Sequence, residues 1–465
     1  MMNSPSPSPA FSERSSDPTA RSRVLFKMAA IGCLILLGLV PLTLIRGVLS
    51  ERRARHREAI ANITSTWGNP QVIAGPVLMV PYQRHVKAWK EQIVDGRSER
   101  HEVTETVVAR AHFLPIDLSV TGDLRPDRLH RGIYEAVVYR SALEIKGRFA
   151  KPSFADWKVA REDILWDEAA VVIGITDLRG ANEALRVKWG EETLTLAPGG
   201  KVGSLGPTIR ARVPGMPFDA ESIAFEFSLN LNGSGSLRFA PFGMSNRVRL
   251  TSPFPDPSFD GAFLPSERKV SASGFQADWL VSYYGRGYPQ QWSDHEGDLL
   301  SGEVLSGSLF GVSVLPVVDS YRYVERSIKY GILFLALVFT AFFLFEVRAL
   351  VPVHPFQYTL VGAALCLFYL ALLSLSEIVP FTWAYAAGAG AATALIGAYS
   401  AFVLRGARRA WLTALGLSVI YGYLFIILRQ QEYSLLFGTV ALFLALGAVM
   451  YATRKIDWYA RDREG

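Results

Sequence analysis

The chain has 465 residues and a formal net charge of +6; half of its residues are hydrophobic and 19% are charged. This length accommodates two or three soluble domains, or one soluble domain with a membrane bundle. Almost all of the long apolar runs lie in Leu25–Ile45 and after Tyr330, which favours the second arrangement. Arg and Lys gather beside these runs and not on one candidate helix face, so we expect no nucleic-acid partner. Both cysteines lie in apolar segments, which leaves the region between them without a disulfide.

The chain begins with a segment rich in Ser and Pro, residues 1–23, whose composition cannot support a packed core. We predict that it is a disordered tail. Residues 24–45 are predicted to form the first transmembrane helix. Its apolar run of about 20 residues continues directly into Arg46 without the small-residue cleavage site of a signal peptide, so we expect an uncleaved anchor.

Residues 327–456 are predicted to form a bundle of five further transmembrane helices, followed by a C-terminal tail at residues 457–465. About 20 apolar residues at a rise of 1.5 Å match the hydrocarbon core of a bilayer. The predicted segments are Tyr330–Phe345, Tyr358–Ser376, Phe381–Leu404, Trp411–Leu428 and Tyr433–Thr453. The sequence therefore predicts six transmembrane helices and a lipid bilayer as the first partner.

Lys and Arg in the short connections predict the orientation of these helices. Arg348, then Arg405, Arg408 and Arg409, then Arg454 and Lys455 mark alternate connections, which the positive-inside rule assigns to the cytoplasm. Both termini are then cytoplasmic, and the large insert between the first two helices is periplasmic, in a bacterial inner membrane. The basic cluster at residues 52–57 departs from this pattern, but long inserts translocate largely regardless of charge.

The region 46–326 is predicted to be a periplasmic domain that is all β or mainly β and antiparallel, arranged as a sandwich or a pair of sheets. Period-two alternation and residues favourable to strands mark Val103–Phe113, Glu135–Gly147, Val171–Thr176 and Glu192–Leu196. Residues 223–231 and 236–239 flank a turn signal at Asn232-Gly233, which predicts a β-hairpin. Before these strands, Ser50–Thr66 is expected to continue the first helix outward until Trp67–Pro70 ends it.

No zinc signature, Walker sequence, dinucleotide fingerprint or nucleophile elbow occurs in the chain. The charged residues between Gly331 and Met450 all lie near segment ends, whereas proton- or ion-coupled carriers place such groups inside the bilayer. We therefore predict no enzymatic activity, no cofactor and no metal. The alternatives are a membrane-associated enzyme that acts on a lipid-linked or cell-wall substrate, using Glu377 with Ser374 and Ser376, and an oligomeric passive conduit.

The segment Pro253–Pro265 is rich in Pro and aromatic residues, which makes it a candidate interaction surface. Its candidate residues are Phe254, Asp256, Phe259, Asp260 and Phe263, together with Trp279. Asp256 and Asp260 are also the carboxylate pair of the enzymatic alternative, because two nearby carboxylates can hold different pKa values. Turn formation by the two Asp residues and core packing of Trp279 are the favoured interpretations.

Small residues recur at helical spacing in the fourth apolar segment. One stripe contains Gly388 between Ala384 and Ala392, and the other consists of Ala386, Gly390, Ala394 and Ala398. Such rows let helices approach closely in lipid. We predict helix packing at Gly388, Gly390 and Ala394 within the chain, with homo-oligomerisation through the same face as the alternative.

The chain resembles the inner-membrane protein CreD family over nearly its whole length after the tail. The motifs that carry the resemblance are Ala74–Val77, Arg131–Val137, Asp177–Gly180, Phe263–Pro265 and Gly274–Trp279, then Phe342–Glu346, His354–Tyr358, Leu373–Glu377 and Arg454–Tyr459. Some members read Trp-Pro-His-Pro where this chain has Phe254–Pro257, so no histidine role is expected there. The resemblance implies a protein of cell-envelope integrity and colicin tolerance without an established reaction. We accordingly expect the β domain to contact envelope proteins or glycans.

Overall fold

A computed structural model describes residues 29–94, 97–181, 184–214, 220–314, 320–349, 353–403, 406–430 and 434–454. The predicted tails at residues 1–23 and 457–465 lie outside the described residues. The chain divides into two compact units, one formed by His56–Val317 and the other by Met1–Arg55 with Val318–Gly465. They are called the β unit and the helical unit, and each is described by itself.

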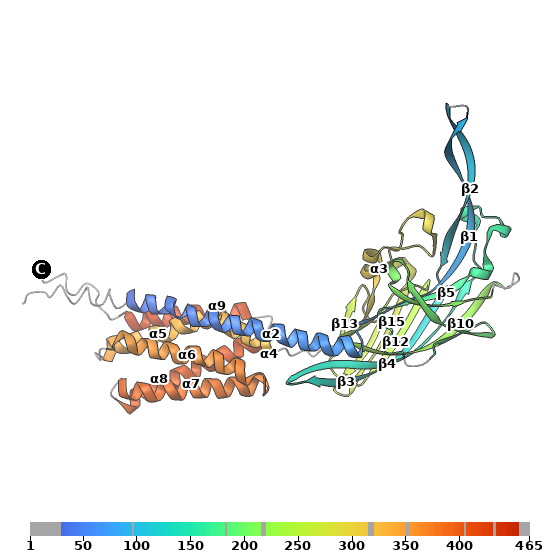
Figure 1. Ribbon diagram of the computed structural model, residues 1–465. Coiled ribbons are helices and arrows are strands. Elements are labelled where there is room, and N and C mark those ends of the chain that lie inside the picture. Colours follow the sequence, from blue (N-terminus) through green and yellow to red (C-terminus); the bar gives the residue numbers. More distant parts are fainter. Residues whose placement is uncertain are drawn as a thin grey trace, which may run out of the picture. The chain divides into compact units, whose positions relative to one another are not determined.

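Two mixed sheets make up the β unit (Figure 1). Within the described residues, the first sheet has nine strands: β1 (Gln71–Val94), β2 (Arg97–Phe113), β5 (Ala170–Ile175), β8 (Ala197–Lys201), β9 (Pro207–Arg212), β11 (Ser236–Phe239), β13 (Ser258–Gly261), β16 (Gln291–Ser293) and β17 (Phe310–Ser313). The second has eight: β3 (Asp117–Arg131), β4 (Tyr134–Ala150), β6 (Arg186–Trp189), β7 (Glu192–Thr195), β10 (Ser222–Ser234), β12 (Ser245–Ser252), β14 (Glu267–Ser271) and β15 (Gly274–Ser282). The prediction of a mainly β domain is therefore confirmed.

The predicted strands are present, but two predictions about their pairing are wrong. The sheets are not wholly antiparallel, because β1 pairs with β11, and β3 with β12, in parallel. The predicted hairpin is absent as well, since β10 pairs with β4 and β6 in the second sheet while β11 pairs with β1 and β17 in the first. Gly235, at a φ of +68°, gives the chain the left-handed backbone at which it leaves one sheet for the other.

Side chains from both sheets meet in one hydrophobic core. Alternate residues of β10, including Phe225, Phe227 and Leu229, are buried, as the period-two pattern requires. They join Ile173 and Phe310 of the first sheet in the same cluster. The β unit is therefore a sandwich whose inner faces exclude water, and burial at roughly 25 cal/mol per Å² of apolar surface supplies its main driving force.

Short helical segments connect the strands of the β unit. Those described are η1 (Ala155–Trp157), η2 (Arg161–Asp163), η3 (Trp166–Glu168), η4 (Gly203–Leu205), η5 (Tyr283–Gly285), η6 (Asp294–Glu296) and α3 (Gly302–Ser308). Beyond the sheet, β1 and β2 continue as a two-stranded hairpin (Figure 1).

The helix α2 (Leu39–Trp67) ends where the sequence predicts, at Trp67 before Gly68. Within the β unit, the end of this helix packs through Ile63 on Ala136 and Val138. The Trp67 indole donates to Tyr139 O over 3.3 Å. The sequence pattern therefore locates both the continuation of the helix and its end.

Buried polar groups tie this helix end to both sheets. The side-chain amide of Gln71, which is fully buried, donates to Asp177 O over 2.9 Å and to Asn232 O over 2.7 Å. Asp177 accepts hydrogen bonds from Asn69 and Arg179, and Arg179 also donates to Ser65 O in the helix. Burial by itself would raise the pKa of Asp177, but these hydrogen bonds outweigh it and lower that pKa. We call this arrangement the Gln71–Asp177 junction.

The helical unit contains α4 (Ser320–Lys329), α5 (Gly331–Ala349), α6 (Pro355–Leu375), α7 (Phe381–Val403), α8 (Ala407–Arg429) and α9 (Ser434–Thr453). Among the described residues, four helices are long and apolar enough to cross a membrane: Ala29–Trp67, Pro355–Leu375, Phe381–Val403 and Ala407–Arg429. A fifth candidate is the pair α4 and α5, which meet at a bend of 48°. A helix occupies each predicted segment, whereas the count established here is four to five candidate spans.

Three of the four Arg residues that depart from the positive-inside pattern, Arg52, Arg53 and Arg55, have acidic partners. Arg52 lies 3.5 Å from Glu377, and Arg53 lies 2.7 Å from Glu325. Both contacts lie inside the helical unit, and Arg55 pairs with Glu51 along the helix at 2.6 Å. Neutralisation by acidic side chains explains how a basic cluster is accommodated here.

Replacing Asp177 with asparagine tests the importance of the Gln71–Asp177 junction. Hydrogen bonds to a charged group contribute about 1.5–3 kcal/mol, so we expect the variant to lower the unfolding temperature of the β unit by about 3–6 °C. Scanning fluorimetry of the purified full chain in detergent measures this change. Asp167→Asn, at an exposed carboxylate of the same unit, is the matched control and should leave the temperature unchanged.

The difference in stability between wild type and Asp177→Asn should depend on pH. A carboxyl group whose pKa is lowered by folding stabilises the fold above its unfolded pKa of about 3.9, and this contribution is lost as the pH falls through the folded pKa. The difference between wild type and Asp177→Asn should therefore shrink as the pH is lowered from 7 to about 3. A constant difference would contradict a role for the ionised carboxylate.

Candidate functional site

The predicted interaction segment Pro253–Pro265 forms part of a sheet. Its residues Ser258–Gly261 are the strand β13, which pairs with β17 at the end of the first sheet. Phe259 packs edge-on against Phe275 and Trp279, with ring centroids 5.6 and 5.7 Å apart. The rigidity expected from the sequence therefore comes from strand pairing and aromatic packing.

Most of the aromatic candidates face the core. Trp279 is 1% exposed and donates from its indole to Phe263 O over 3.2 Å, so it packs as a core residue, the interpretation favoured from the sequence. Phe254 and Phe263 are partly buried against the same cluster. Asp256 and Leu264 are among the exposed side chains of the segment.

The two carboxylates of this segment have different surroundings. Both carboxylate oxygens of Asp260 accept hydrogen bonds from Arg238, over 3.1 and 3.2 Å, and one also accepts from Ser313 over 2.6 Å. Asp256 is exposed. Asp260 therefore acts as a structural anion between β11, β13 and β17, which is unlike the free carboxylate that a general base needs.

The alternative carboxylate Glu377 is also engaged. It accepts a hydrogen bond from Tyr321 over 3.3 Å in addition to its contact with Arg52. The Ser376 hydroxyl donates to Leu373 O over 2.9 Å within its own helix turn. The structure thus joins Glu377 to α4 and to the first helix instead of to a serine.

The two small-residue stripes of α7 point in different directions. Gly388 is buried, and a Cβ built on it would lie 3.3 Å from Cδ2 of Phe368 in α6. The stripe of Gly390 and Ala394 is exposed, and a Cβ on Gly390 would meet nothing within 4 Å. Gly388 therefore serves close packing of α7 on α6, whereas Gly390 and Ala394 leave an open face.

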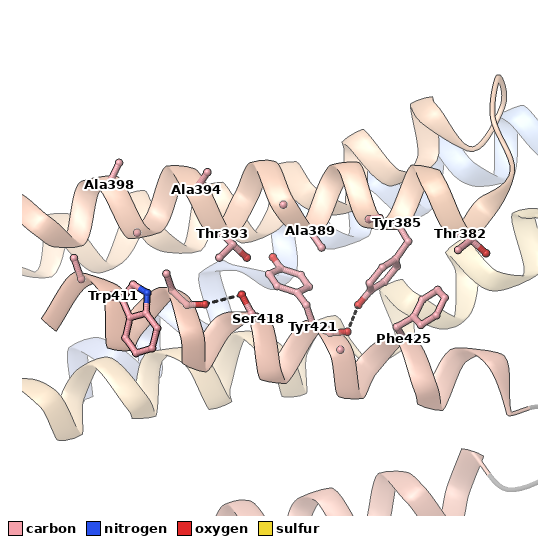
Figure 2. A pocket seen from close by; sticks show the side chains of 16 residues that line it. Thr382, Tyr385, Ala389, Thr393, Ala394, Ala398, Trp411, Ser418, Tyr421 and Phe425 are labelled. Carbon is pink, nitrogen blue, oxygen red and sulfur yellow. Dashed lines mark hydrogen bonds between the residues drawn. The ribbon is translucent and has the colours of Figure 1, made fainter. Parts of the chain in front are cut away.

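That open face lines an apolar groove of about 740 Å³ between α7 and α8 (Figure 2). Tyr385 crosses from α7 and donates to Tyr421 O over 2.7 Å at one end of the groove. Trp411 lies toward the other end, and Ser418 uses its hydroxyl within its own helix by donating to Ala414 O over 2.8 Å. The groove offers apolar surface and few free polar groups, as expected for a face that contacts lipid or a helix.

A second cavity, of about 910 Å³, lies on the β unit, and the sequence patterns did not reveal it. Alternation in β1, β2, β5 and β9 sends one set of side chains into the core and the other to the opposite face of the first sheet. Strand pairing aligns one residue from each of five neighbouring strands in a row across that face. These residues, in order, are Trp292, His112, Met79, Ala170 and Arg212. The segment around Leu205 packs over this face, since a Cβ on Gly174 would lie 2.6 Å from Leu205 O. We call the cavity the sheet-face cleft.

One wall of the sheet-face cleft is held by polar contacts. His112 stacks on Trp292, with ring centroids 5.0 Å apart, and contacts Asp294 over 2.6 Å. This hydrogen bond and the nearby Arg110 lower the pKa of Asp294 despite its partial burial, so the carboxylate stays ionised at neutral pH. His112 and Asp294 lie 182 positions apart, and no local motif joins them.

A buried arginine positions the strand that carries Trp292. Arg286 is 8% exposed and donates to Pro241 O, Phe242 O and Gly243 O. It also contacts Gln290 over 2.5 Å, and Gln290 in turn donates to Leu114 O and Pro115 O beside the end of β2. Burial lowers the pKa of Arg286, and the carbonyl oxygens compensate its charge.

In the part of the chain that the structure describes, no group of three or more His, Cys, Asp or Glu side chains is arranged to hold a metal ion.

The fold thus defines a class: a helical membrane protein that carries a large β sandwich between its first and second apolar helices. The model of the family "Inner membrane protein CreD" matches residues 23–459. The chain is also 32% identical over 441 residues to the inner membrane protein CreD of Escherichia coli strain K12, which covers 95% of each chain. This chain belongs to the CreD family of inner-membrane proteins and is a multi-pass inner-membrane protein.

The unequal environments of Gly388 and Gly390 provide a matched test of helix packing. Gly388→Val should destabilise the helical unit by about 1–3 kcal/mol, because the new methyl groups overpack the contact with Phe368. Gly390→Val changes the same residue type in the same helix but enters open space, so it should be nearly neutral. Unfolding of the full chain in mixed detergent and SDS micelles measures both, and equal losses would contradict this account.

Proposed function

We propose that the chain crosses the inner membrane six times, keeps both termini in the cytoplasm and holds its β unit in the periplasm, where this unit contributes to cell-envelope integrity by contacting envelope proteins or glycans. Family membership supports the membrane and the envelope. The helix α9, with 20 residues and a length of about 30 Å, is the sixth span. Its backbone at Phe437 O accepts a hydrogen bond from Tyr423 of α8 over 2.6 Å.

The observation that carries this topology is the set of contacts among helix ends. Arg52, beyond the first apolar run, contacts Glu377 in the connection between α6 and α7. Arg326, before α5, donates to Ile427 O and Leu428 O at the end of α8. If successive spans alternate in direction, the end of the first helix, the start of α5 and the ends of α6 and α8 all lie on the same side of the membrane. The two sets of contacts are consistent with this arrangement. Arg408 and Arg409, which precede α8, belong to the opposite and cytoplasmic side under the positive-inside rule.

We propose that the β unit binds a partner instead of catalysing a reaction, since two of the three carboxylates considered for catalysis are already engaged: Asp260 by Arg238 and Ser313, and Glu377 by Arg52. Its contact with an envelope partner is proposed at Asp256 and Leu264, where the Pro253–Pro265 segment is exposed. Leu264 follows the edge strand β13 closely, so this exposed side chain offers apolar area at a small cost in loop ordering.

Cysteine labelling tests the orientation. In a variant with Cys33→Ala and Cys366→Ala, a cysteine placed by Leu264→Cys should react with a membrane-impermeant maleimide in cells whose outer membrane is permeabilised. A cysteine placed by Arg408→Cys, also at an exposed position, should react only after the inner membrane is opened. The reverse pattern would contradict a periplasmic β unit.

Photo-crosslinking tests the interaction surface. A photoreactive phenylalanine analogue at position 256 or 264 should give a discrete adduct in living cells, because both side chains are exposed beside the strand edge. The same analogue at position 133, where Ile133 is 59% exposed on the β3–β4 turn, is the control. The absence of a discrete adduct at 256 and 264, or the same adducts at all three positions, would contradict this surface.

A further inference from the structure

We propose that the sheet-face cleft binds a small ligand that carries at least two anionic groups, phosphate or carboxylate, through Lys201, Arg210 and Arg212. This inference rests on the proposed function, which places the β unit and therefore the ligand in the periplasm. It adds the chemical class of the ligand.

The floor of the cleft is built from small and apolar groups. Val172 pairs with Arg210, and Ala170 pairs with Arg212, in the register of β5 and β9. Both floor residues are buried, with 1% and 8% exposure, beneath a cavity of about 910 Å³. Because the side chains of Ala170 and Val172 are shorter than those of Arg210 and Arg212, they leave a depression that the two arginines border.

The two arginines are spaced for an extended anion. Arg210 and Arg212 are two residues apart on β9, so they share a face with Cα atoms about 7 Å apart. Both are exposed, and Lys201 lines the same cleft from β8. Guanidinium groups match the geometry of carboxylate and phosphate in a bidentate manner, so this spacing suits two anionic groups on one ligand.

No acidic side chain that the structure describes pairs with these cations. Within the described residues, the side chains of Lys201, Arg210 and Arg212 form no ion pair, although Glu168 and Asp298 also line the cleft. The third acidic group, Asp294, is already held by His112 and Arg110. Three unpaired cations around one depression repel one another and attract anions, which is the charge arrangement expected of an anion-binding site.

Calorimetric titration of the full chain, purified in a non-ionic detergent, tests the proposal with pyrophosphate as the probe. Wild type should bind it saturably at low salt, and more weakly as salt is raised. The double variant Arg210→Ala and Arg212→Ala should bind at least tenfold more weakly. Lys201→Ala provides a second variant in case the double variant does not fold. Arg247→Ala removes an exposed arginine from the second sheet and is the control, with no change expected.

Displacement experiments distinguish the sources of the anion. Tricarballylate represents a soluble carboxylate ligand, and dihexanoyl phosphatidylglycerol below its micelle concentration represents a lipid headgroup; displacement of pyrophosphate by either supports the proposal and identifies the source. The proposal is overturned if wild type shows no saturable pyrophosphate binding, or if Arg247→Ala weakens binding as much as the double variant. Because purified protein is used, failure here would leave the cysteine-labelling result, and hence the proposed topology, unaffected.

Discussion

The β unit depends on the buried hydrogen bonds of the Gln71–Asp177 junction. The side-chain amide of Gln71 bonds the backbone after β5 and the backbone of β10, which belong to different sheets. Asp177 adds Asn69 and Arg179, and Arg179 reaches the last turns of α2. Such a network is costly to leave half-satisfied, so the helix end, the first strand and both sheets are constrained together. The backbone of Gly68 also packs closely on the backbone of Asn232, since a Cβ on Gly68 would lie 2.6 Å from Asn232 O.

Polar contacts also order the helical unit, at the ends of its helices. Arg326 satisfies carbonyl groups at the end of α8 that lack helical partners, and its positive charge suits the negative end of the helix dipole. Between these ends the helices pack through small and aromatic residues, as at Gly388 on Phe368. Charge at the ends and close packing between them is the division of roles expected when lipid supplies no hydrophobic driving force between helices.

The sheet-face cleft shows how a site arises without a motif. Its charged residues are separated by long stretches of sequence, and only strand register brings His112 and Arg212 into one row. The alternation of Arg210 and Arg212 with Ile209 and Ala211 was the one local signal, since it indicates a strand with a basic outer face. That signal by itself cannot distinguish a solvated face from the side of a cavity.

The sequence by itself determined the helices, the end of the first helix at Trp67 and most of the strands, because hydrophobic periodicity and helix-breaking residues act locally. It also located the small-residue stripes of α7 but not which of them would pack. Tertiary structure alone decided that β10 and β11 join different sheets and that Asp260 pairs with Arg238. Alternation specifies which face of a strand is buried, whereas its partner depends on contacts between residues far apart in the chain, and these have no local signature.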